Sequence, residues 1–372
     1  MKVGMFTYGM ADRLTGIGRY TVELTRALRR VEPTLEVVLL NPYPASPLPW
    51  YREFETYDVP HLAKAPLAAT LGNLELRLAA DRLKLDVLHD PCGIAPFVAP
   101  RGRHARVVTV HDAIPVIDPS VQPPFTRAVF KTLIPAARWT ADAIITISQS
   151  AAHDLEHHLR LPREKLHVTL NGVAPPVARS EQDVRAVLDA LDLDEPYFLY
   201  VGALDPRKNL QRVLEAFAAV EREQPSARLV IVGGARWQAT PIVERAKGMR
   251  NVRLTGFVSD ADLAALYQGA TALVFPSLYE GFGLPILEAM TYGTPVITSS
   301  VSSMPEVAGD AALLVNPLDV EALVNAMRSL LTQTALRAEL SRRGCERATL
   351  FTWEQTARQT LEVYASVLNR RH

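Results

Sequence analysis

The chain has 372 residues, which is too long for one ordinary hydrophobic core and fits two domains of common size. Its 40 Lys and Arg residues balance its 40 Asp and Glu residues, a neutrality that argues against a nucleic-acid-binding protein. With two cysteines, no signal-peptide pattern and no apolar run of bilayer length, the protein is expected in the cytoplasm.

Short apolar or β-branched runs alternate with longer amphipathic stretches along the whole chain. In chain order the runs are Lys2–Tyr8, Glu36–Asn41, Asp86–His89, Arg106–His111, Ala143–Ser148, His167–Leu170, Tyr197–Gly202, Arg228–Gly233, Val252–Thr255, Ala272–Pro276, Pro295–Ser299 and Ala312–Asn316. Strands buried on both faces have this composition, so each half predicts a parallel sheet wrapped by helices. The alternation predicts the α/β class, with two doubly wound, Rossmann-like domains that face each other across a cleft.

Residues 171–180 have the turn and linker chemistry of a domain boundary. The predicted parts are an N-terminal domain at 1–175, a C-terminal domain at 176–352 and a C-terminal helix within 353–372. A helix is expected at Glu181–Leu191. The amphipathic stretch Trp353–Leu368 can dock on either domain, including a return onto the N-terminal one.

The strongest functional signal is the run from Glu280 to Glu288, EGFGLPILE, which follows a predicted strand. Two glycines allow a tight turn and close approach of the backbone to a ligand, and Pro285 suits the first turn of a helix. The free N–H groups and the dipole of that helix predict an anion site, with Glu280 at its mouth and Glu288 about one turn in. The structural alternative is an exposed glutamate followed by one that only favours the helix dipole.

With this run, the chain resembles the retaining glycosyltransferases of family 4, which have the GT-B fold and carry two glutamates separated by seven residues. The resemblance covers nearly the whole chain and is most specific from Tyr197 to Val315. It implies an acceptor-binding N-terminal domain and a C-terminal domain that binds a nucleotide-sugar. It also implies that Glu280 contacts the hydroxyls of the donor sugar and Glu288 those of the ribose. The backbone amides implied to meet the sugar or the diphosphate are those of Phe282, Gly283 and Leu284.

Two adjacent cations, Arg207 and Lys208, follow the strand predicted at Tyr197–Gly202 and open a helix. They suit a diphosphate and would neutralise the charge that grows on a leaving group. The alternative is a solvated basic pair at a helix start, where cations are mildly unfavourable. Many members of the resembled family carry an arginine directly after the glycine of this loop. This chain has Ala203 there, and we expect Arg207 to supply the charge.

The resemblance also implies donor contacts at positions with weaker local patterns. Gly16 and Gly18 form a glycine-rich loop, which alone is as often a simple turn, and the equivalent loop of the family covers the donor diphosphate. Val258 lies where family members hold the nucleobase through backbone atoms. Ser148 ends a predicted strand at the cleft of the family, but it also suits the N-cap of a helix at Gln149–Leu159.

Two histidines end predicted strands. His111 can donate a hydrogen bond to a sugar hydroxyl or move a proton, or it can be a satisfied structural residue, and the resemblance favours contact with the donor hexose. For His89 and the following Asp90, an acceptor pocket and a structural role are equally open.

No cofactor is expected, because the nucleotide-sugar is a substrate. No metal site is expected either. Asp192-Leu193-Asp194 is a DxD pattern, but it precedes a strand and is interpreted as a loop. His153, His157 and His158 have helical spacing and are interpreted as a solvated helix face rather than a metal site. The run Phe125–Ile134 mixes apolar and basic residues, so it predicts either a core-facing helix or a peripheral contact with the inner face of a membrane.

The sequence thus predicts a retaining, metal-independent hexosyltransferase with Arg207, Lys208, Glu280 and His111 as catalytic residues. The stretch Ser299–Asp310 resembles bacterial mannosyltransferases of surface-polysaccharide assembly, which favours GDP-mannose as the donor and a sugar or lipid-linked saccharide as the acceptor. A UDP-hexose donor is the alternative. A GT-B epimerase acting on a UDP-sugar fits the glutamate spacing poorly, and the intact charged residues argue against a non-catalytic sugar-nucleotide-binding protein.

Overall fold

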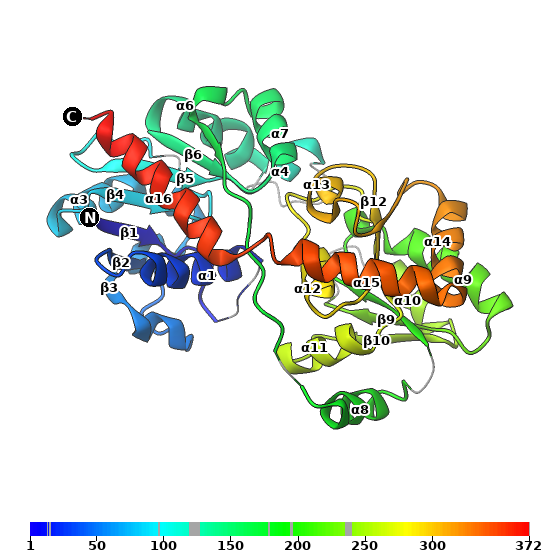
Figure 1. Cartoon of the computed structure of the whole chain (residues 1–372). Helices are drawn as coiled ribbons and strands as arrows, with labels where there is room; N and C mark the ends of the chain where they lie inside the picture. The colour runs from blue at the N-terminus through cyan, green and yellow to red at the C-terminus, as the bar shows by residue number, and fades with distance from the viewer. Residues whose placement is uncertain are drawn as a thin grey trace. The chain divides into compact units, whose positions relative to one another are not determined.

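The computed structural model describes residues 1–12, 14, 16–95, 97–118, 127–177, 179–193, 196–234 and 240–371. The chain divides into two compact units, of which unit 1 comprises Met1–Gly172 and Thr352–His372, and unit 2 comprises Val173–Phe351 (Figure 1). Three parts of the predicted features lie outside the described residues. They are Ala178 of the linker, Asp194 of the DxD pattern and the first two residues of Phe125–Ile134.

Unit 1 is built on a parallel sheet of seven strands in the order β3-β2-β1-β4-β5-β6-β7. Six of these strands coincide with predicted runs, and the edge strand β3 was not predicted because its sequence, ETYD, is polar and mostly exposed. The strands are β1 (Lys2–Phe6), β2 (Glu36–Asn41), β3 (Glu55–Asp58), β4 (Val87–Asp90), β5 (Ala105–Thr109), β6 (Ala143–Thr146) and β7 (Leu166–Val168).

Helices of unit 1 cover the sheet on both faces, because its strands carry apolar side chains in both directions. Leu40 of β2, Leu88 of β4, Val108 of β5 and Ile144 of β6 belong to one hydrophobic core of the unit. The helices are α1 (Gly16–Val31), α2 (Ala65–Ala69), α3 (Gly72–Leu83), α4 (Ile114–Ile117), α6 (Ala137–Thr140), α7 (Gln149–Leu159) and α16 (Trp353–Asn369). Of these, α1 and α16 pack side by side (Figure 1).

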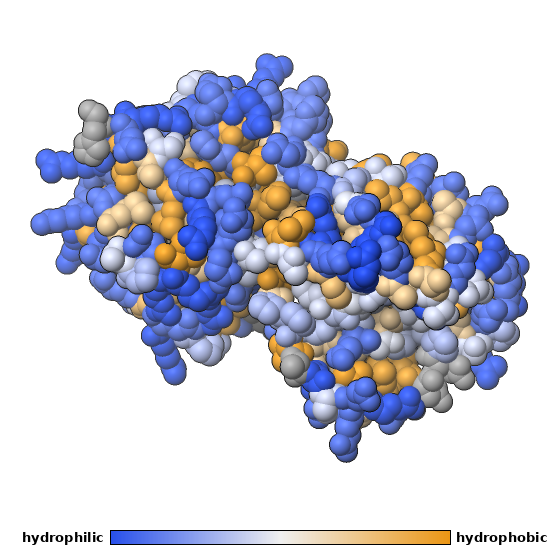
Figure 2. Space-filling view, in the orientation of Figure 1, coloured by the Kyte–Doolittle hydropathy of each residue, from blue (hydrophilic) through white to orange (hydrophobic). Residues whose placement is uncertain are grey.

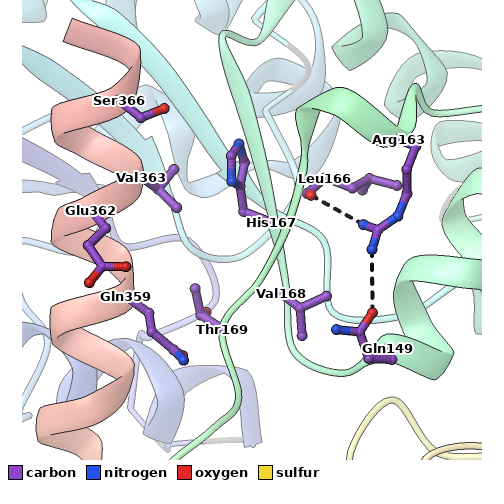
Figure 3. A pocket seen from close by; sticks show the side chains of 10 residues that line it. All are labelled: Gln149, Arg163, Leu166, His167, Val168, Thr169, Gln359, Glu362, Val363 and Ser366. Carbon is purple, nitrogen blue, oxygen red and sulfur yellow. Dashed lines mark hydrogen bonds between the residues drawn. The ribbon is translucent and has the colours of Figure 1, made fainter. Parts of the chain in front are cut away.

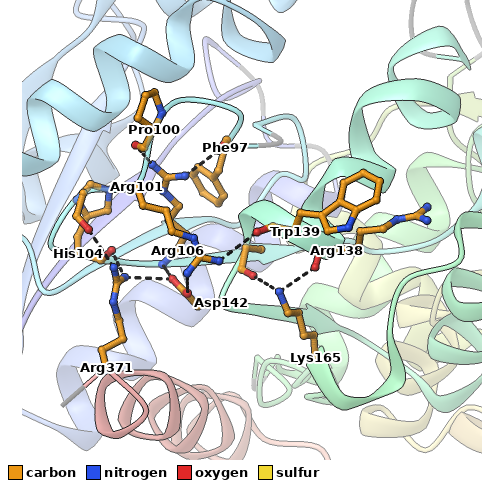
Figure 4. A network of polar contacts seen from close by, with 12 residues as sticks. Phe97, Pro100, Arg101, His104, Arg106, Arg138, Trp139, Asp142, Lys165 and Arg371 are labelled. Carbon is orange, nitrogen blue, oxygen red and sulfur yellow. Dashed lines mark hydrogen bonds and ion pairs between the residues drawn. The ribbon is translucent and has the colours of Figure 1, made fainter.

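The C-terminal helix α16 is tied to unit 1 by polar contacts at both ends. Near its start, Arg30 of α1 pairs with Glu354 at 2.7 Å. Beyond its end, the Arg371 guanidinium pairs with Asp142 at 3.2 Å and donates to the backbone carbonyls of Gly102 and His104 (Figure 4). Asp142 also accepts the backbone N–H of Arg106, so the network joins the end of the chain to the loop ahead of β5.

Unit 2 is built on a parallel sheet of six strands in the order β10-β9-β8-β11-β12-β13. All six coincide with predicted runs. The strands are β8 (Tyr197–Val201), β9 (Arg228–Val232), β10 (Val252–Gly256), β11 (Ala272–Phe275), β12 (Val296–Ser299) and β13 (Leu313–Val315). The helices are α8 (Glu181–Ala190), α9 (Leu210–Glu223), α10 (Thr240–Lys247), α11 (Asp260–Gly269), α12 (Leu284–Thr291), α13 (Met304–Ala308), α14 (Val320–Thr332) and α15 (Thr334–Ala348).

The surface face drawn in Figure 2 is mostly hydrophilic, with hydrophobic residues in small patches. Among the described residues, no helix combines the length and the hydropathy that a membrane crossing requires. In the described part of the predicted Phe125–Ile134 helix, Val129 is buried, whereas Arg127 and Lys131 are exposed. That distribution agrees with a core-facing segment with solvated cations, and membrane contact stays a prediction.

Candidate active site

Two loops of unit 2 meet because their strands are neighbours in the sheet. Strand β8 pairs with β11, with Phe198 opposite Ala272 and Leu199 opposite Leu273. The strand order reverses between them, and open parallel sheets bind their ligands beyond the carboxyl ends of the strands at such a point. The loop after β8 carries Arg207 and Lys208 on a short 3₁₀ turn, Pro206–Lys208, and the loop after β11 carries Glu280.

Arg207, Lys208 and Glu280 form a nearly buried cluster, hereafter the cation–glutamate cluster. Lys208 Nζ lies 2.5 Å from Glu280 Oε1, and Arg207 Nη1 lies 3.1 Å from Glu280 Oε2, so each carboxylate oxygen has its own cation. The three side chains are only 10–14% exposed. The Lys208 ammonium also lies 4.7 Å from the centre of the Phe275 ring, a cation–π contact.

The cluster keeps Glu280 ionised. Burial by itself would raise the pKa of this carboxyl, but the nearby charges of Lys208 and Arg207 outweigh it, and the pKa lies below its ordinary value. Two cations face the Glu280 carboxylate here, and the buried Asp205 carboxylate lies in the same turn and acts on Lys208. The two cations can still attract an added anion, because charge interactions are stronger where water is excluded.

Hydrogen bonds fix both loops that supply the cluster. Asp205 caps the turn by accepting the Arg207 N–H at 2.9 Å. Asn209 ends it in the left-handed conformation, with a φ of 61°, and its side-chain amide donates to the carbonyls of Pro276 and Pro317. Ser302 donates to the Glu280 carbonyl at 2.7 Å, and Ser303 donates to the same carbonyl at 2.9 Å. The sequence analysis did not single out Ser302 and Ser303 as contacts of the glutamate.

The glycine-rich run ends in helix α12, as predicted. Gly283 has a φ of 108°, which disfavours a side chain, and it precedes the first helical residue, Leu284. Ser303 helps to fix the loop, because its hydroxyl also donates to the Phe282 carbonyl at 2.8 Å. Pro285 at the second helical position has no N–H to leave unpaired. The resulting helix start lies in the same loop as Glu280.

Glu288 lies in the second turn of α12, half-buried, and its Oε2 accepts a hydrogen bond from the Tyr267 hydroxyl at 2.8 Å. The Tyr267 ring stacks on Tyr292, with centroids 6.0 Å apart. Tyr267 therefore orients the carboxylate, a role that the sequence analysis missed because Tyr267 lies on another helix, α11. Val258 lies between β10 and α11 and is half-buried.

His111 belongs to unit 1, where it follows β5. Its Nε2 lies 2.8 Å from the carbonyl of Pro91, and its ring meets Tyr20 edge-on at 4.8 Å. Because a carbonyl only accepts, Nε2 carries the proton and Nδ1 is left as an acceptor. Burial lowers the pKa of His111 to about 4, so the ring is neutral at pH 7. Hydrogen-bond donation, proton transfer and a structural role were all open for His111 from the sequence, and its contact with a hexose stays a prediction.

The structure resolves the alternatives for His89. This side chain is fully buried, with Nδ1 2.6 Å from the Tyr364 hydroxyl and Nε2 2.8 Å from Thr109 Oγ1. Both ring nitrogens are thus used, and His89 is structural. Asp90 is also fully buried and accepts backbone N–H groups from Cys92, Ile94 and Ala95, so it shapes the loop that presents Pro91 to His111.

The remaining predicted residues of unit 1 also lie beyond the carboxyl ends of its strands. Gly16 begins α1 and Gly18 is buried in its first turn. Ser148 is buried and caps α7 by accepting the Ala151 N–H at 2.9 Å, as the N-cap alternative expected. Its contact with a donor stays a prediction.

The described residues contain no group of three or more His, Cys, Asp or Glu side chains placed to hold a metal ion. On α7, the rings of His153 and His157 stack 6.2 Å apart at the protein surface. Metal-independent activity is a separate matter and stays a prediction.

Comparisons with known proteins agree with this architecture. Residues 14–175 match the family model described as "Glycosyltransferase Family 4", and residues 188–347 match the one described as "Glycosyl transferases group 1". A protein of Escherichia coli named O-antigen chain mannosyltransferase B is 31% identical over 387 residues, which cover 98% of this chain and 99% of that protein. The MMP alpha-(1->4)-mannosyltransferase of Mycolicibacterium hassiacum is 27% identical and covers 100% of this chain and 99% of its own.

Solved structures share the fold. Sucrose-phosphate synthase from Thermosynechococcus elongatus superposes with a TM-score of 0.78 at 24% identity, covering 99% of both chains. The Anabaena protein HepE, solved in complex with UDP and glucose, superposes with a TM-score of 0.76 at 18% identity, covering 98% of this chain and all of its own. With two parallel sheets of the GT-B type and an E. coli relative similar over nearly its full length, the chain belongs to glycosyltransferase family 4.

Proposed function

We propose that this protein is a retaining, metal-independent mannosyltransferase that moves mannose from GDP-mannose to a sugar or lipid-linked saccharide in surface-polysaccharide synthesis. The observation that carries the proposal is the cation–glutamate cluster beside the start of α12. It holds two cations, Arg207 and Lys208, in a nearly buried site, and this pair suits the diphosphate of a nucleotide-sugar.

The choice of mannose rests on the relatives. The E. coli and M. hassiacum proteins named above are both called mannosyltransferases, and each is similar to this chain over nearly its full length. The name of the E. coli protein refers to O-antigen, a surface polysaccharide, which supports the acceptor class.

In the proposed mechanism, the phosphate of the leaving group acts as the base. Glu280 is engaged by two cations, which makes it a poor nucleophile, and it is instead proposed to hold hydroxyls of the donor sugar. The phosphate oxygen that leaves C1 takes the proton of the acceptor hydroxyl on the same face, so the new bond keeps the anomeric configuration. Arg207 and Lys208 stabilise the charge that develops on the diphosphate.

The proposed roles of the other residues come from the family resemblance, and the contacts described above are compatible with them. Glu288, oriented by Tyr267, accepts from the ribose hydroxyls. The neutral His111 accepts a hydrogen bond at Nδ1 from a hexose hydroxyl. Contacts with the donor are also proposed for Gly16, Gly18 and Ser148 of unit 1, and for Val258 and the amides of Phe282, Gly283 and Leu284 of unit 2.

A nucleotide panel tests the proposal. GDP at 100 times its dissociation constant should raise the free energy of unfolding by about 2.7 kcal/mol, and UDP and ADP at the same concentration should do less. GDP-mannose incubated without acceptor should be hydrolysed slowly by the wild type. Stabilisation by UDP rather than GDP would contradict the donor, and formation of an epimer of the sugar would contradict transfer.

A further inference from the structure

A second polar pocket lies in unit 1, between the edge strand β7 and helix α16. Its volume is about 470 Å³, and Figure 3 shows side chains of α16 facing the strand across it. We call it the β7–α16 pocket. Its lining residues are Gln149, Arg163, Leu166, His167, Val168, Thr169, Gln359, Glu362, Val363 and Ser366.

Three buried polar atoms of this lining have no hydrogen-bond partner within the described part of the chain. They are Nε2 of His167, Oγ1 of Thr169 and Oε1 of Gln359. Burying a polar atom without a partner costs about 1–3 kcal/mol, so such atoms in a native protein are normally satisfied by water or by a ligand. All three lie on a pocket that is large enough for several water molecules or for a small polar molecule.

The lining calls for a ligand that both donates and accepts hydrogen bonds. Gln359 Oε1 and the exposed Glu362 carboxylate only accept, so the ligand must bring donors. Arg163 only donates, and its two contacts, to Leu166 O at 3.4 Å and Gln149 Oε1 at 3.5 Å, are long and leave donors for a ligand (Figure 3). A phosphate would place its negative charge beside the Glu362 carboxylate, which disfavours it. A neutral, hydroxyl-rich molecule can donate to Gln359 and Glu362 and accept from Arg163.

The lining of the pocket includes Thr169, which follows β7, in the same sheet whose strand β5 precedes His111. In the register, Thr109 lies beside Ile145 and Thr146 beside Val168, so His111, Gln149 and Thr169 all follow the carboxyl ends of adjacent strands. A chain of sugars bound at those carboxyl ends can therefore continue along β7 towards Ser366. We propose that the β7–α16 pocket is a saccharide subsite, which holds sugar units of the acceptor other than the one that reacts. This inference rests on the proposed transfer to a saccharide acceptor.

The direct test is binding of tetrasaccharides to the full chain by calorimetry, with manno-, gluco- and galacto-tetraose as the probes. At least one should bind the wild type. Gln359→Ala should weaken that binding about 5- to 10-fold, as expected for one lost hydrogen bond, and Glu362→Gln should weaken it in the same direction. Glu362 is exposed, so its substitution should leave folding intact.

Gln355→Ala is the matched control. Gln355 is an exposed glutamine in the first turn of the same helix, and Thr352 caps its backbone N–H, which the substitution keeps. In transfer assays, Gln359→Ala should raise KM for a tetrasaccharide acceptor and leave KM for the corresponding monosaccharide unchanged.

The inference is overturned if no tetrasaccharide binds the wild type, or if Gln359→Ala binds as tightly as Gln355→Ala, in which case the pocket holds only water. The donor measurements are independent of these results. Failure of GDP-mannose as a donor, with intact tetrasaccharide binding, would overturn the proposed donor and keep the subsite.

Discussion

Lys208 Nζ and Glu280 Oε1 lie 2.5 Å apart, although the two residues are 72 positions apart in the sequence. The pairing of β8 with β11 makes this contact, because it brings the loops after both strands to one edge of the sheet. Arg207 completes the pairing at the second carboxylate oxygen. The cluster is therefore held together by contacts within unit 2, and such preorganised charges need little rearrangement when they stabilise a leaving group.

Removing either cation should impair turnover. Lys208→Ala and Arg207→Ala are each expected to lower kcat about 100-fold, because each removes a preorganised charge from the leaving group. Lys247→Ala is the control, since Lys247 is an exposed lysine of α10 that pairs only with the exposed Glu244 among the described residues. Steady-state kinetics with the confirmed donor make the comparison. Wild-type turnover in both variants would remove these residues from the mechanism.

Substitutions within the cluster should change the free energy of unfolding in a non-additive way. Glu280→Gln leaves two buried cations without their carboxylate and should lower the free energy of unfolding by about 3–5 kcal/mol. Lys208→Met in the same chain should return at least about 1 kcal/mol of it, because contacting residues are not additive. Urea unfolding of the two single variants and the double variant measures the coupling. Additive changes would show that the pair is not energetically linked.

The product should keep the anomeric configuration of the donor, and Glu280 should never carry a glycosyl group. Retaining glycosidases place two carboxyl groups about 5 Å apart and use one as a nucleophile, whereas Glu280 is bound to two cations. Proton NMR of the first product reports the configuration, and mass spectrometry of peptides reports any adduct. An inverted product or a glycosylated Glu280 would refute the mechanism.

Activity should survive an excess of EDTA. Arg207, Lys208 and the start of α12 are proposed to supply the charge stabilisation that Mg²⁺ supplies in other transferases. The rate before and after chelation, with Mg²⁺ or Mn²⁺ added back, makes the test. Complete loss with recovery on metal addition would mean that the leaving-group site is misassigned.

Acid should destabilise the protein through buried neutral histidines. Burial lowers the pKa of His89 to about 3 and those of His104 and His111 to about 4, below the ordinary value of 6.5. The unfolded chain therefore binds more protons below pH 6.5, and stability is complete above that pH and declines as pH falls through this window. Each histidine contributes up to about 1.4 kcal/mol per pH unit.

His89→Gln isolates one of these contributions. Glutamine keeps a polar side chain near Tyr364 and Thr109 but does not titrate. The slope of the unfolding free energy against pH measures how many more protons the unfolded chain binds, and this number should fall by about one between pH 6.5 and 4. Denaturant unfolding across this range gives the slope. An unchanged slope would show that His89 is protonated in the folded protein.

Local pattern was enough for most of the secondary structure. The twelve predicted strands all formed, and α7 begins and ends where the sequence predicted, because buried parallel strands and capped helices leave strong signals in apolar runs and turn residues. Strand β3 was missed because an exposed edge strand lacks such a run. The motif from Glu280 to Glu288 likewise predicted its own loop and helix α12.

The sequence by itself determined the α/β class, every strand except the edge strand β3, and the presence of two cations and two glutamates after strands. Only the tertiary structure decided that Glu280 pairs with Arg207 and Lys208, that Tyr267 orients Glu288, and that His89 is structural while His111 presents an acceptor. These relationships join side chains that are distant in the sequence. The order of strands in each sheet sets them, and no local pattern of residues encodes that order.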